Sequence, residues 1–421
     1  MSPAALTDGY PLGPHVSQHW QLRKPAAHAA RGGGMVVSQV KAAAEAGVAM
    51  LDAGGSAADA AVATAFTLAA LEPWNSGLGG IGFTQVMSPG GEAETFDFGP
   101  VAPASLDPSA FVLTGRMKDD LFPWPEVAGD RNVHGPLSCV VPSAVAGYAL
   151  LHARHGRLPM RDLLAPAVAH AKRGLPQDWY TTLKVASSAG VLRLYPESAR
   201  IYLPGGLPPV PPYQGSPGFF TLGRLAATLE RLQGAGLDDF YTGEVAAGIV
   251  ADMRELGGVV SAADLANCKA RVLPAVAVPW RDGRTLMLSN GLTATPTLRG
   301  VMRGMMEADW SGNAPSPAWY AQLARVMRAA YADRLEGLGE AEPKAAESCT
   351  THLTVCDRDG MMVSMTTTLL SSMGSRLVLP RSGVLMNNGV MWFDPRPGTP
   401  NAIAPGKRPL TNMSPVIVAK D

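Results

Sequence analysis

The sequence predicts a layered α/β protein, because helical patterns fill most of the chain and strand patterns follow near its end. From Ser38 to Ala53, apolar residues and alanines recur at helical spacing and stop at a glycine pair, a common helix end. Residues 349–370 alternate polar and apolar side chains on both sides of Asp359-Gly360, as in a β-hairpin. Helices first and strands late favour stacked layers over alternating βαβ units.

The remaining elements follow from the same signals. Ser56 stands three residues before Asp59, which predicts a capping box. The helix that it opens runs to about Leu71 and is apolar on nearly every side, so we expect it to be buried. We also expect a strand at 94–98, helices at 142–155, 163–172, 222–232, 243–257 and 317–335, a Pro/Gly loop at 203–218, and strands from Thr351 onward.

Composition excludes several classes of protein. The chain has 421 residues, with 35 basic and 35 acidic side chains, so neither nucleic acid nor a polybasic membrane contact is expected. Hydrophobic residues make up 47% and charged residues 17%, which indicates a well-buried globular core. The longest apolar run, 57–71, is too short and too often interrupted to span a membrane.

Location and cofactors follow from what the motifs lack. Residues 1–31 show no basic region followed by an apolar core, and the four cysteines show no metal or disulfide spacing, so a cytoplasmic protein is expected. Residues 77–82 match G-x-G-x-x-G, but a helix precedes them and a strand follows, the reverse of a dinucleotide site. His152 and His155 have no third ligand at a recognisable spacing. We therefore expect no cofactor and no metal.

Thr350 opens the hairpin directly after a loop-like run, residues 337–349. If the chain is cut before this residue, the freed α-amine, with an ordinary pKa near neutrality, can take the proton of the hydroxyl on the same residue. One residue would then supply both nucleophile and base. The local pattern alone equally suits an ordinary strand threonine, because β-branched residues fit a pleated surface.

Distant motifs in a fixed order favour the nucleophile over the ordinary strand threonine. They are Gly54-Gly55-Ser56-Ala57-Ala58-Asp59-Ala60-Ala61, the run from Glu72-Pro73-Trp74-Asn75 to Phe83, Asn387-Asn388, Pro405-Gly406-Lys407-Arg408-Pro409-Leu410 and Met413-Ser414-Pro415. Together with the hairpin they resemble the γ-glutamyltranspeptidase family, from about Gly33 to the C-terminal end. The resemblance implies the four-layer αββα sandwich of N-terminal nucleophile hydrolases.

The resemblance also implies how the chain matures. It would cleave itself between Cys349 and Thr350, leaving fragments 1–349 and 350–421. We expect these fragments to contain a flexible segment 1–34, a large-subunit region 35–349 and a small-subunit region 350–421, together in one structural domain. Thr368 matches the family's second threonine, whose hydroxyl hydrogen-bonds the nucleophile. Relatives often pair their cleaved units, so a homo-oligomer is expected.

Departures from the family pattern concern the substrate. Relatives that use γ-glutamyl compounds hold the substrate with an arginine, an asparagine, a glutamine, an aspartate and a serine pair. The matching residues here are Gly99, Leu370, Gly389, Trp392 and Thr411-Asn412. Losing a bidentate carboxylate clamp costs a few kcal/mol by itself, so efficient γ-glutamyl transfer is not expected.

Residues 369–376 and 387–395 resemble a branch that includes oxamate amidohydrolase. By that resemblance Arg376 would bind a substrate carboxylate, with Asn388, Thr411 and Asn412 beside it, and the substrate would be a small amide such as oxamate. A shorter loop at 394–407 also leaves room for bulky amides of the cephalosporin-acylase kind. γ-Glutamyl hydrolysis or transfer stays open as a further alternative.

The chain stops at Asp421, before a glycine pair and further strands that relatives use. From this we expect an incomplete small subunit and, if oxyanion donors are lost, a rate lower by a factor on the order of 10²–10³. A catalytically silent member that acts as a binding protein is therefore the alternative of another class. Self-cleavage would distinguish an active amidohydrolase from the silent binding protein.

Overall fold

A seven-stranded antiparallel sheet forms the centre of the protein. The computed structural model describes residues 27–118, 124–216, 218–306, 308, 316–338 and 350–420. The strand order is β1 (Ala27–Ala29), β2 (Gly34–Val37), β12 (Thr351–Asp357), β13 (Met362–Thr368), β3 (Ile81–Met87), β4 (Ala93–Phe98) and β9 (Arg271–Pro274). The predicted hairpin thus lies in the middle of the sheet, between strands from far earlier in the chain.

A second, three-stranded antiparallel sheet contains β10 (Val276–Trp280), β11 (Arg284–Leu288) and β14 (Val416–Lys420). Strand β14 lies over β3 and β13 of the large sheet. Two short ribbons complete the strands of the described residues: β5 (Leu113–Met117) with β6 (Pro125–Val127), and β7 (Leu175–Pro176) with β8 (Phe219–Phe220).

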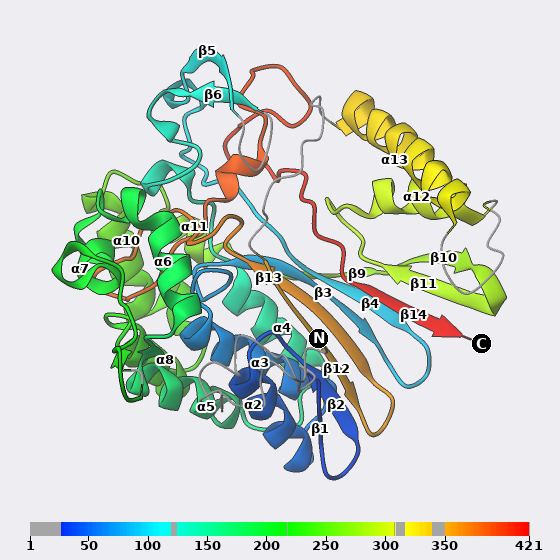
Figure 1. The fold of residues 1–421 in the computed structure, drawn as a ribbon, viewed down its shortest axis with the longest axis horizontal. Helices are drawn as coiled ribbons and strands as arrows, with labels where there is room; N and C mark the ends of the chain where they lie inside the picture. The colour runs from blue at the N-terminus through cyan, green and yellow to red at the C-terminus, as the bar shows by residue number, and fades with distance from the viewer. Residues whose placement is uncertain are drawn as a thin grey trace.

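Helices cover the outer faces of the two sheets (Figure 1). On the large sheet lie α3 and α4, with α2, α5 and α8 beside or behind them, whereas α12 and α13 cover the small sheet. The helices are α2 (Lys41–Asp52), α3 (Ala57–Leu71), α4 (Ala144–His155), α5 (Met160–Arg173), α6 (Trp179–Leu192), α7 (Pro196–Tyr202), α8 (Leu225–Ala235), α9 (Asp239–Thr242), α10 (Glu244–Glu255), α11 (Ala262–Ala266), α12 (Thr295–Met306) and α13 (Pro317–Leu338). The order helix, sheet, sheet, helix confirms the αββα fold.

Helix α3 is the central helix of the main core. All of its residues are buried, as its apolar composition predicts. The capping box is present: the Ser56 side chain accepts from the Asp59 backbone, and Asp59 accepts from the Ser56 backbone. Asp357, at the end of β12, accepts from the Ala57 backbone N–H at 2.9 Å. Strand β12 and helix α3 are therefore joined at their ends.

Glycines let the chain pass close beneath the end of the hairpin. A Cβ on Gly82 would lie 2.3 Å from the Thr366 carbonyl oxygen, and one on Gly79 would lie 2.2 Å from that of Leu385. Either distance is far below van der Waals contact. Helix α3 precedes the glycine-rich run 77–82, and β3 begins within that run at Ile81, which is the order of elements that the sequence predicts.

The secondary structure differs from the expectation in two places. Strands do not dominate after Thr351. Between β13 and β14 the chain is mostly irregular, because side-chain hydrogen bonds hold it in place and several of its residues have positive φ. Residues 27–29 and 34–37 are strands of the sheet, although they overlap the range expected to be flexible. Residues 1–26 of that range lie outside the described residues.

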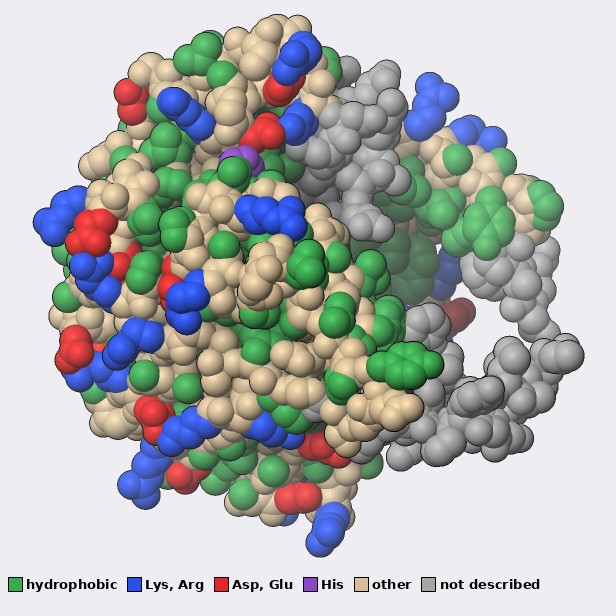
Figure 2. Space-filling model, turned by 60° about the vertical axis from the view of Figure 1, so that its left-hand side comes forward, with side chains coloured by type: hydrophobic (Ala, Val, Ile, Leu, Met, Phe, Trp, Pro, Cys, Tyr) green, Lys and Arg blue, Asp and Glu red, His purple; other side chains and the backbone are tan. Residues whose placement is uncertain are grey.

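Surface charge is mixed. On the face drawn in Figure 2, lysines and arginines alternate with acidic side chains and form no extended field of one sign. None of the described helices is both long and apolar enough to cross a membrane. Among the described residues, no group of three His, Cys, Asp or Glu could hold a metal ion.

Candidate active site

The hairpin brings Thr350 and Thr368 together. Thr351 pairs with Thr367, so Thr350 and Thr368 face each other at the open end of β12 and β13. Their side chains lie on the sheet face opposite α3, because side chains alternate along a strand. The Thr350 hydroxyl donates to the Thr368 Oγ1 at 3.2 Å. The structure thus places the two threonines of the resemblance in direct contact, while Cys349 lies outside the described residues.

Thr368 is itself held in place. It is fully buried, and its Oγ1 also accepts from the Leu370 backbone N–H at 2.8 Å. Its strand neighbour is Ile81 at the start of β3. A hydroxyl fixed by the backbone gives the Thr350 side chain one preferred direction.

Unusual backbone follows Thr368. Leu370, Met373 and Arg376 have φ of 86°, 60° and 59°, a region that L-residues adopt at a cost of roughly 1–2 kcal/mol each. The segment is kept there by the Leu369 N–H, which donates to the Asn75 carbonyl, and the Met373 N–H, which donates to the Trp74 carbonyl, both at 2.9 Å. Strain of this kind is found mainly beside functional sites.

Asn388 and Arg376 meet at shared acceptors. The Asn388 amide donates to the Val133 carbonyl at 2.7 Å and to the Ser371 hydroxyl at 2.8 Å. Arg376 Nη1 donates to the same hydroxyl at 2.8 Å and to the Gly374 carbonyl at 2.6 Å. Both side chains thus brace the loop after Thr368. Burial first, and the Arg376 charge second, lower the pKa of His134 on the neighbouring segment.

Thr411 and Asn412 lie on another wall. The Thr411 hydroxyl donates to the Leu292 carbonyl at 2.9 Å, and its own carbonyl accepts from Arg334 at 3.1 Å. Asn412 accepts from the Trp392 indole N–H at 3.3 Å. Of the sequence-predicted residues, the structure groups Thr350 with Thr368, Arg376 with Asn388, and Thr411 with Asn412.

An apolar wall connects these groups. It consists of buried side chains in one cluster: Ile81, Phe83, Leu370, Trp392 and Met413. By the family resemblance, Leu370 and Trp392 match positions that are polar in relatives that use γ-glutamyl compounds. At Gly99, a Cβ would lie 2.5 Å from the Phe83 ring, so the ring occupies the space that an arginine side chain would enter.

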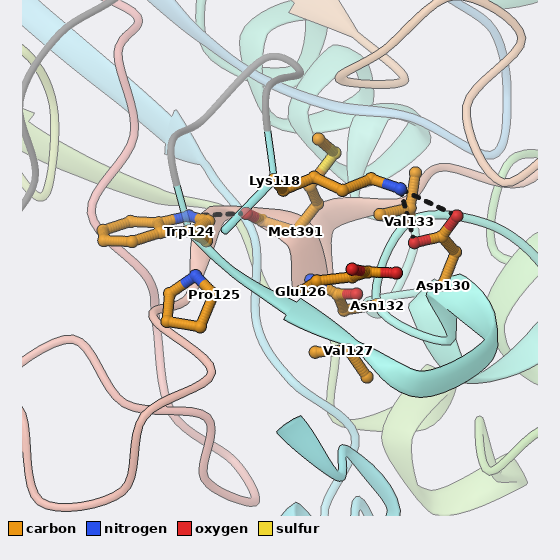
Figure 3. Close-up of a pocket in the computed structure, with 9 residues that line it drawn as sticks. All are labelled: Lys118, Trp124, Pro125, Glu126, Val127, Asp130, Asn132, Val133 and Met391. Carbon is orange, nitrogen blue, oxygen red and sulfur yellow. Dashed lines mark hydrogen bonds and ion pairs between the residues drawn. The ribbon is translucent and has the colours of Figure 1, made fainter. Parts of the chain in front are cut away.

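Figure 3 shows a small cavity lined by Val133, Met391 and Lys118, which pairs with Asp130 at 2.7 Å. The Asn388 side chain contacts both Val133 and Met391. The Trp124 indole N–H donates to the Met391 carbonyl at 3.2 Å. The cavity has room for about one water molecule, so it is no substrate pocket.

The sequence reasoning assigned no role to two residues that the structure brings to the site. Ser371 joins Arg376 to Asn388. Glu72, which is 1% exposed, accepts from the Thr351 hydroxyl at 2.7 Å. A glutamate at the end of a helix that is apolar on nearly every side was the signal that could have identified Glu72.

Comparison with known proteins agrees with this geometry. The family model described as gamma-glutamyltranspeptidase matches residues 43–349 and 339–421. The chain is 32% identical to a glutathione hydrolase proenzyme of Pseudomonas aeruginosa, over 92% of this chain and 75% of that protein. It is 30% identical to the acylase ACY 1 proenzyme of Pseudomonas sp. strain SE83, over 97% of this chain and 77% of that protein.

Solved structures show the same fold. A cephalosporin acylase from Bacillus halodurans superimposes with a TM-score of 0.80 at 24% identity, covering 95% of this chain and 77% of that one. The gamma-glutamyltranspeptidase of Helicobacter pylori gives 0.63 at 26% identity, covering 74% and 85%. With the motifs in order and the fold in place, the chain belongs to the gamma-glutamyltranspeptidase family, whose members are N-terminal nucleophile hydrolases.

Proposed function

We propose that this protein is an amidohydrolase that cleaves itself before Thr350 and then uses Thr350 as its nucleophile. The observation that carries the proposal is the contact between the Thr350 and Thr368 hydroxyls at the ends of two paired strands. The proenzyme names of two relatives support processing in this family.

The reaction needs no group beyond the chain and water. The Thr350 oxygen attacks the amide carbonyl while the α-amine of the same residue takes the hydroxyl proton. The resulting ammonium returns that proton to the leaving amine as the C–N bond breaks. Water then attacks the ester, which releases the carboxylic acid and restores the Thr350 hydroxyl.

The acyl group of the substrate is proposed to be non-glutamyl. Leu370 and Trp392 offer apolar surface where a γ-glutamyl substrate needs partners for its α-amino and α-carboxyl groups, and Phe83 fills the space at Gly99. A charged amino-acid head placed against such a wall would lose hydration without compensation. The similarity to an acylase supports an amide whose acyl group presents carbon atoms to this wall.

A small acidic amide such as oxamate is the second candidate. The observation that favours it is Arg376, a half-buried cation joined through Ser371 to Asn388. Its planar guanidinium suits a carboxylate. The Nη1 contacts with Gly374 and Ser371 favour the alternative that Arg376 braces the loop.

Processing is tested first. Intact-mass measurement of the purified protein is compared with Thr350→Ala and with Thr350→Ser, which keeps a hydroxyl. A fragment beginning at Thr350 in the wild type but not in the alanine variant is the expected result. A chain that stays whole in both would refute the proposal and favour a silent binding protein.

Substrates are tested next with the processed protein. We expect hydrolysis of an amide with an apolar or aromatic acyl group to exceed that of γ-glutamyl-p-nitroanilide and of oxamate. If oxamate is preferred and Arg376→Ala abolishes its turnover, the second candidate holds. Preference for the γ-glutamyl compound would refute the interpretation of the apolar wall.

A further inference from the structure

Glu72 is placed where a carboxylate is costly. It directly follows α3 and is 1% exposed. Removing a carboxylate from water is unfavourable, and the C-terminal end of a helix carries partial negative charge that repels an anion. The ionised form of Glu72 therefore depends on the groups that surround its carboxylate.

Two donors surround the Glu72 carboxylate. The Thr351 hydroxyl donates to it at 2.7 Å. Gln39 lies against the same group: with its amide nitrogen turned toward Glu72, that nitrogen is 2.7 and 3.3 Å from the two carboxylate oxygens. Hydrogen bonds donated to a carboxylate favour its ionised form.

The segment that begins at Glu72 touches both sides of the candidate site. Its first residue holds Thr351, which follows the nucleophile. Its Trp74 and Asn75 carbonyls hold Met373 and Leu369, which follow Thr368. One short segment, 72–75, therefore fixes the spacing between the two strands at the point where Thr350 and Thr368 meet.

We propose that Glu72 is a positioning residue: it anchors the start of β12 and supplies the negative charge that stabilises the α-ammonium formed on Thr350. This rests on the proposed function, because the amine exists only after cleavage. When the Thr350 oxygen attacks, its proton moves to the α-amine, and the ammonium lies near the Glu72 carboxylate until the proton passes to the leaving amine.

Covalent geometry limits the distance between the Thr350 α-amine and the Glu72 carboxylate. The Thr350 nitrogen is one residue from Thr351, so it lies within about 10 Å of the Glu72 oxygen that Thr351 contacts. At that distance, and at an effective dielectric of about 20, one charge moves the titration of another by about one pH unit.

Other titratable groups near this point are neutral or directed elsewhere. His352 lies on the same sheet face as Thr350, opposite to Thr351, and desolvation lowers its pKa. Tyr148 of α4 contacts Thr367, and burial raises its pKa to about 12. Lys184 of α6 lies over the Tyr180 ring, behind Trp74. The Arg376 guanidinium is directed at Ser371 and Gly374.

The test is the pH profile of kcat/KM for the processed enzyme and its Glu72→Gln variant. The variant keeps the shape of the side chain and one acceptor oxygen, but it replaces the other oxygen by an NH2 donor and loses the charge. Without the anion the ammonium is less stable, so the acid limb should move to lower pH by about one unit. An acid limb that does not move would overturn the proposal.

Two controls keep the result interpretable. Asp252 is equally buried and pairs with Arg381 away from the site, so Asp252→Asn should lower stability without moving the limb. The wild-type α-amine can be titrated directly, from the pH dependence of its acylation in the fragment beginning at Thr350. A pKa above the ordinary range of about 7.7–8.0 is expected, and a lower value overturns the proposal even if the Gln variant does not fold.

Failure of the two proposals would look different. A wild-type chain that never yields a fragment beginning at Thr350 would refute the proposed function, and the role of Glu72 with it. A chain that is processed and active, but whose amine titrates alike in wild type and Glu72→Gln, would refute the role of Glu72 alone.

Discussion

Thr368→Val tests whether the contact between the two threonines matters for chemistry. Valine has the same shape but removes the oxygen that receives the Thr350 hydroxyl at 3.2 Å and the Leu370 N–H at 2.8 Å. Leaving that buried N–H unpaired costs about 1–3 kcal/mol. For 421 residues the unfolding entropy is about 0.9 kcal/mol per degree, so Tm should fall by about 1–3 °C.

The effect on self-cleavage should be larger than stability explains. Loss of one hydrogen bond that orients the nucleophile raises the barrier by about 1–2 kcal/mol, which slows the reaction about 5- to 30-fold. The assay is the time course of the fragment beginning at Thr350, followed by mass spectrometry alongside thermal unfolding. Thr368→Ser, which keeps the oxygen, should restore most of the rate.

Thr366→Val is the matched control. Thr366 lies two residues earlier on the same strand face, and its hydroxyl pairs with the His352 ring at 2.9 Å. It should lower Tm by a similar amount and leave cleavage nearly unchanged. Equal slowing in Thr366→Val and Thr368→Val would refute the reasoning, because the loss would then reflect general weakening of the hairpin.

Three further predictions concern the walls of the site. Gly99→Arg should destabilise by about 1–3 kcal/mol in urea unfolding, because its Cβ would meet the Phe83 ring, and it should not create γ-glutamyl-p-nitroanilide hydrolysis; a gain of that activity would contradict the prediction. Leu370→Asn relieves positive φ but loses apolar burial, so we expect a net loss of about 1–3 kcal/mol in urea unfolding and an increase in γ-glutamyl hydrolysis relative to wild type. Desolvation lowers the pKa of His352, so the folded state binds its proton less readily than the unfolded state. Stability from this group is present above about pH 6.5 and is lost as pH falls below it, so Tm should drop less between pH 7 and 5 in His352→Gln than in wild type.

Local signals in the sequence were enough for much of the fold. The alternation around Asp359-Gly360 predicted the β12–β13 hairpin, and Ser56 with Asp59 predicted the start of α3. These features depend on residues close together in sequence. The layered αββα arrangement came only from the family resemblance, and the order of the strands was not predicted, since nothing local says that β2 and β3 flank the hairpin.

Part of the site also depends on residues that are close together in sequence. Thr350 and Thr368 are joined by the hairpin register, so a strand pattern places them opposite each other. The contact of Glu72 with Thr351 spans 279 residues, and Val133 reaches Asn388 across 255. Contacts at such separations depend on tertiary packing, which apolar periodicity cannot specify. The irregular backbone of residues 369–376 was missed because positive φ at Leu370 and Arg376 contradicts ordinary residue preference.

The central place of the hairpin also sets the timing of maturation. Strands β12 and β13 pair with β2 and β3, so the surroundings of Thr350 cannot form until segments more than 250 residues apart have met. Sheets built from such distant pairs assemble slowly, because loop closure precedes the contacts that offset it. Appearance of the fragment beginning at Thr350 would therefore report that the whole sheet has assembled. After the cut, both new pieces would stay interleaved, each supplying neighbours that the other needs.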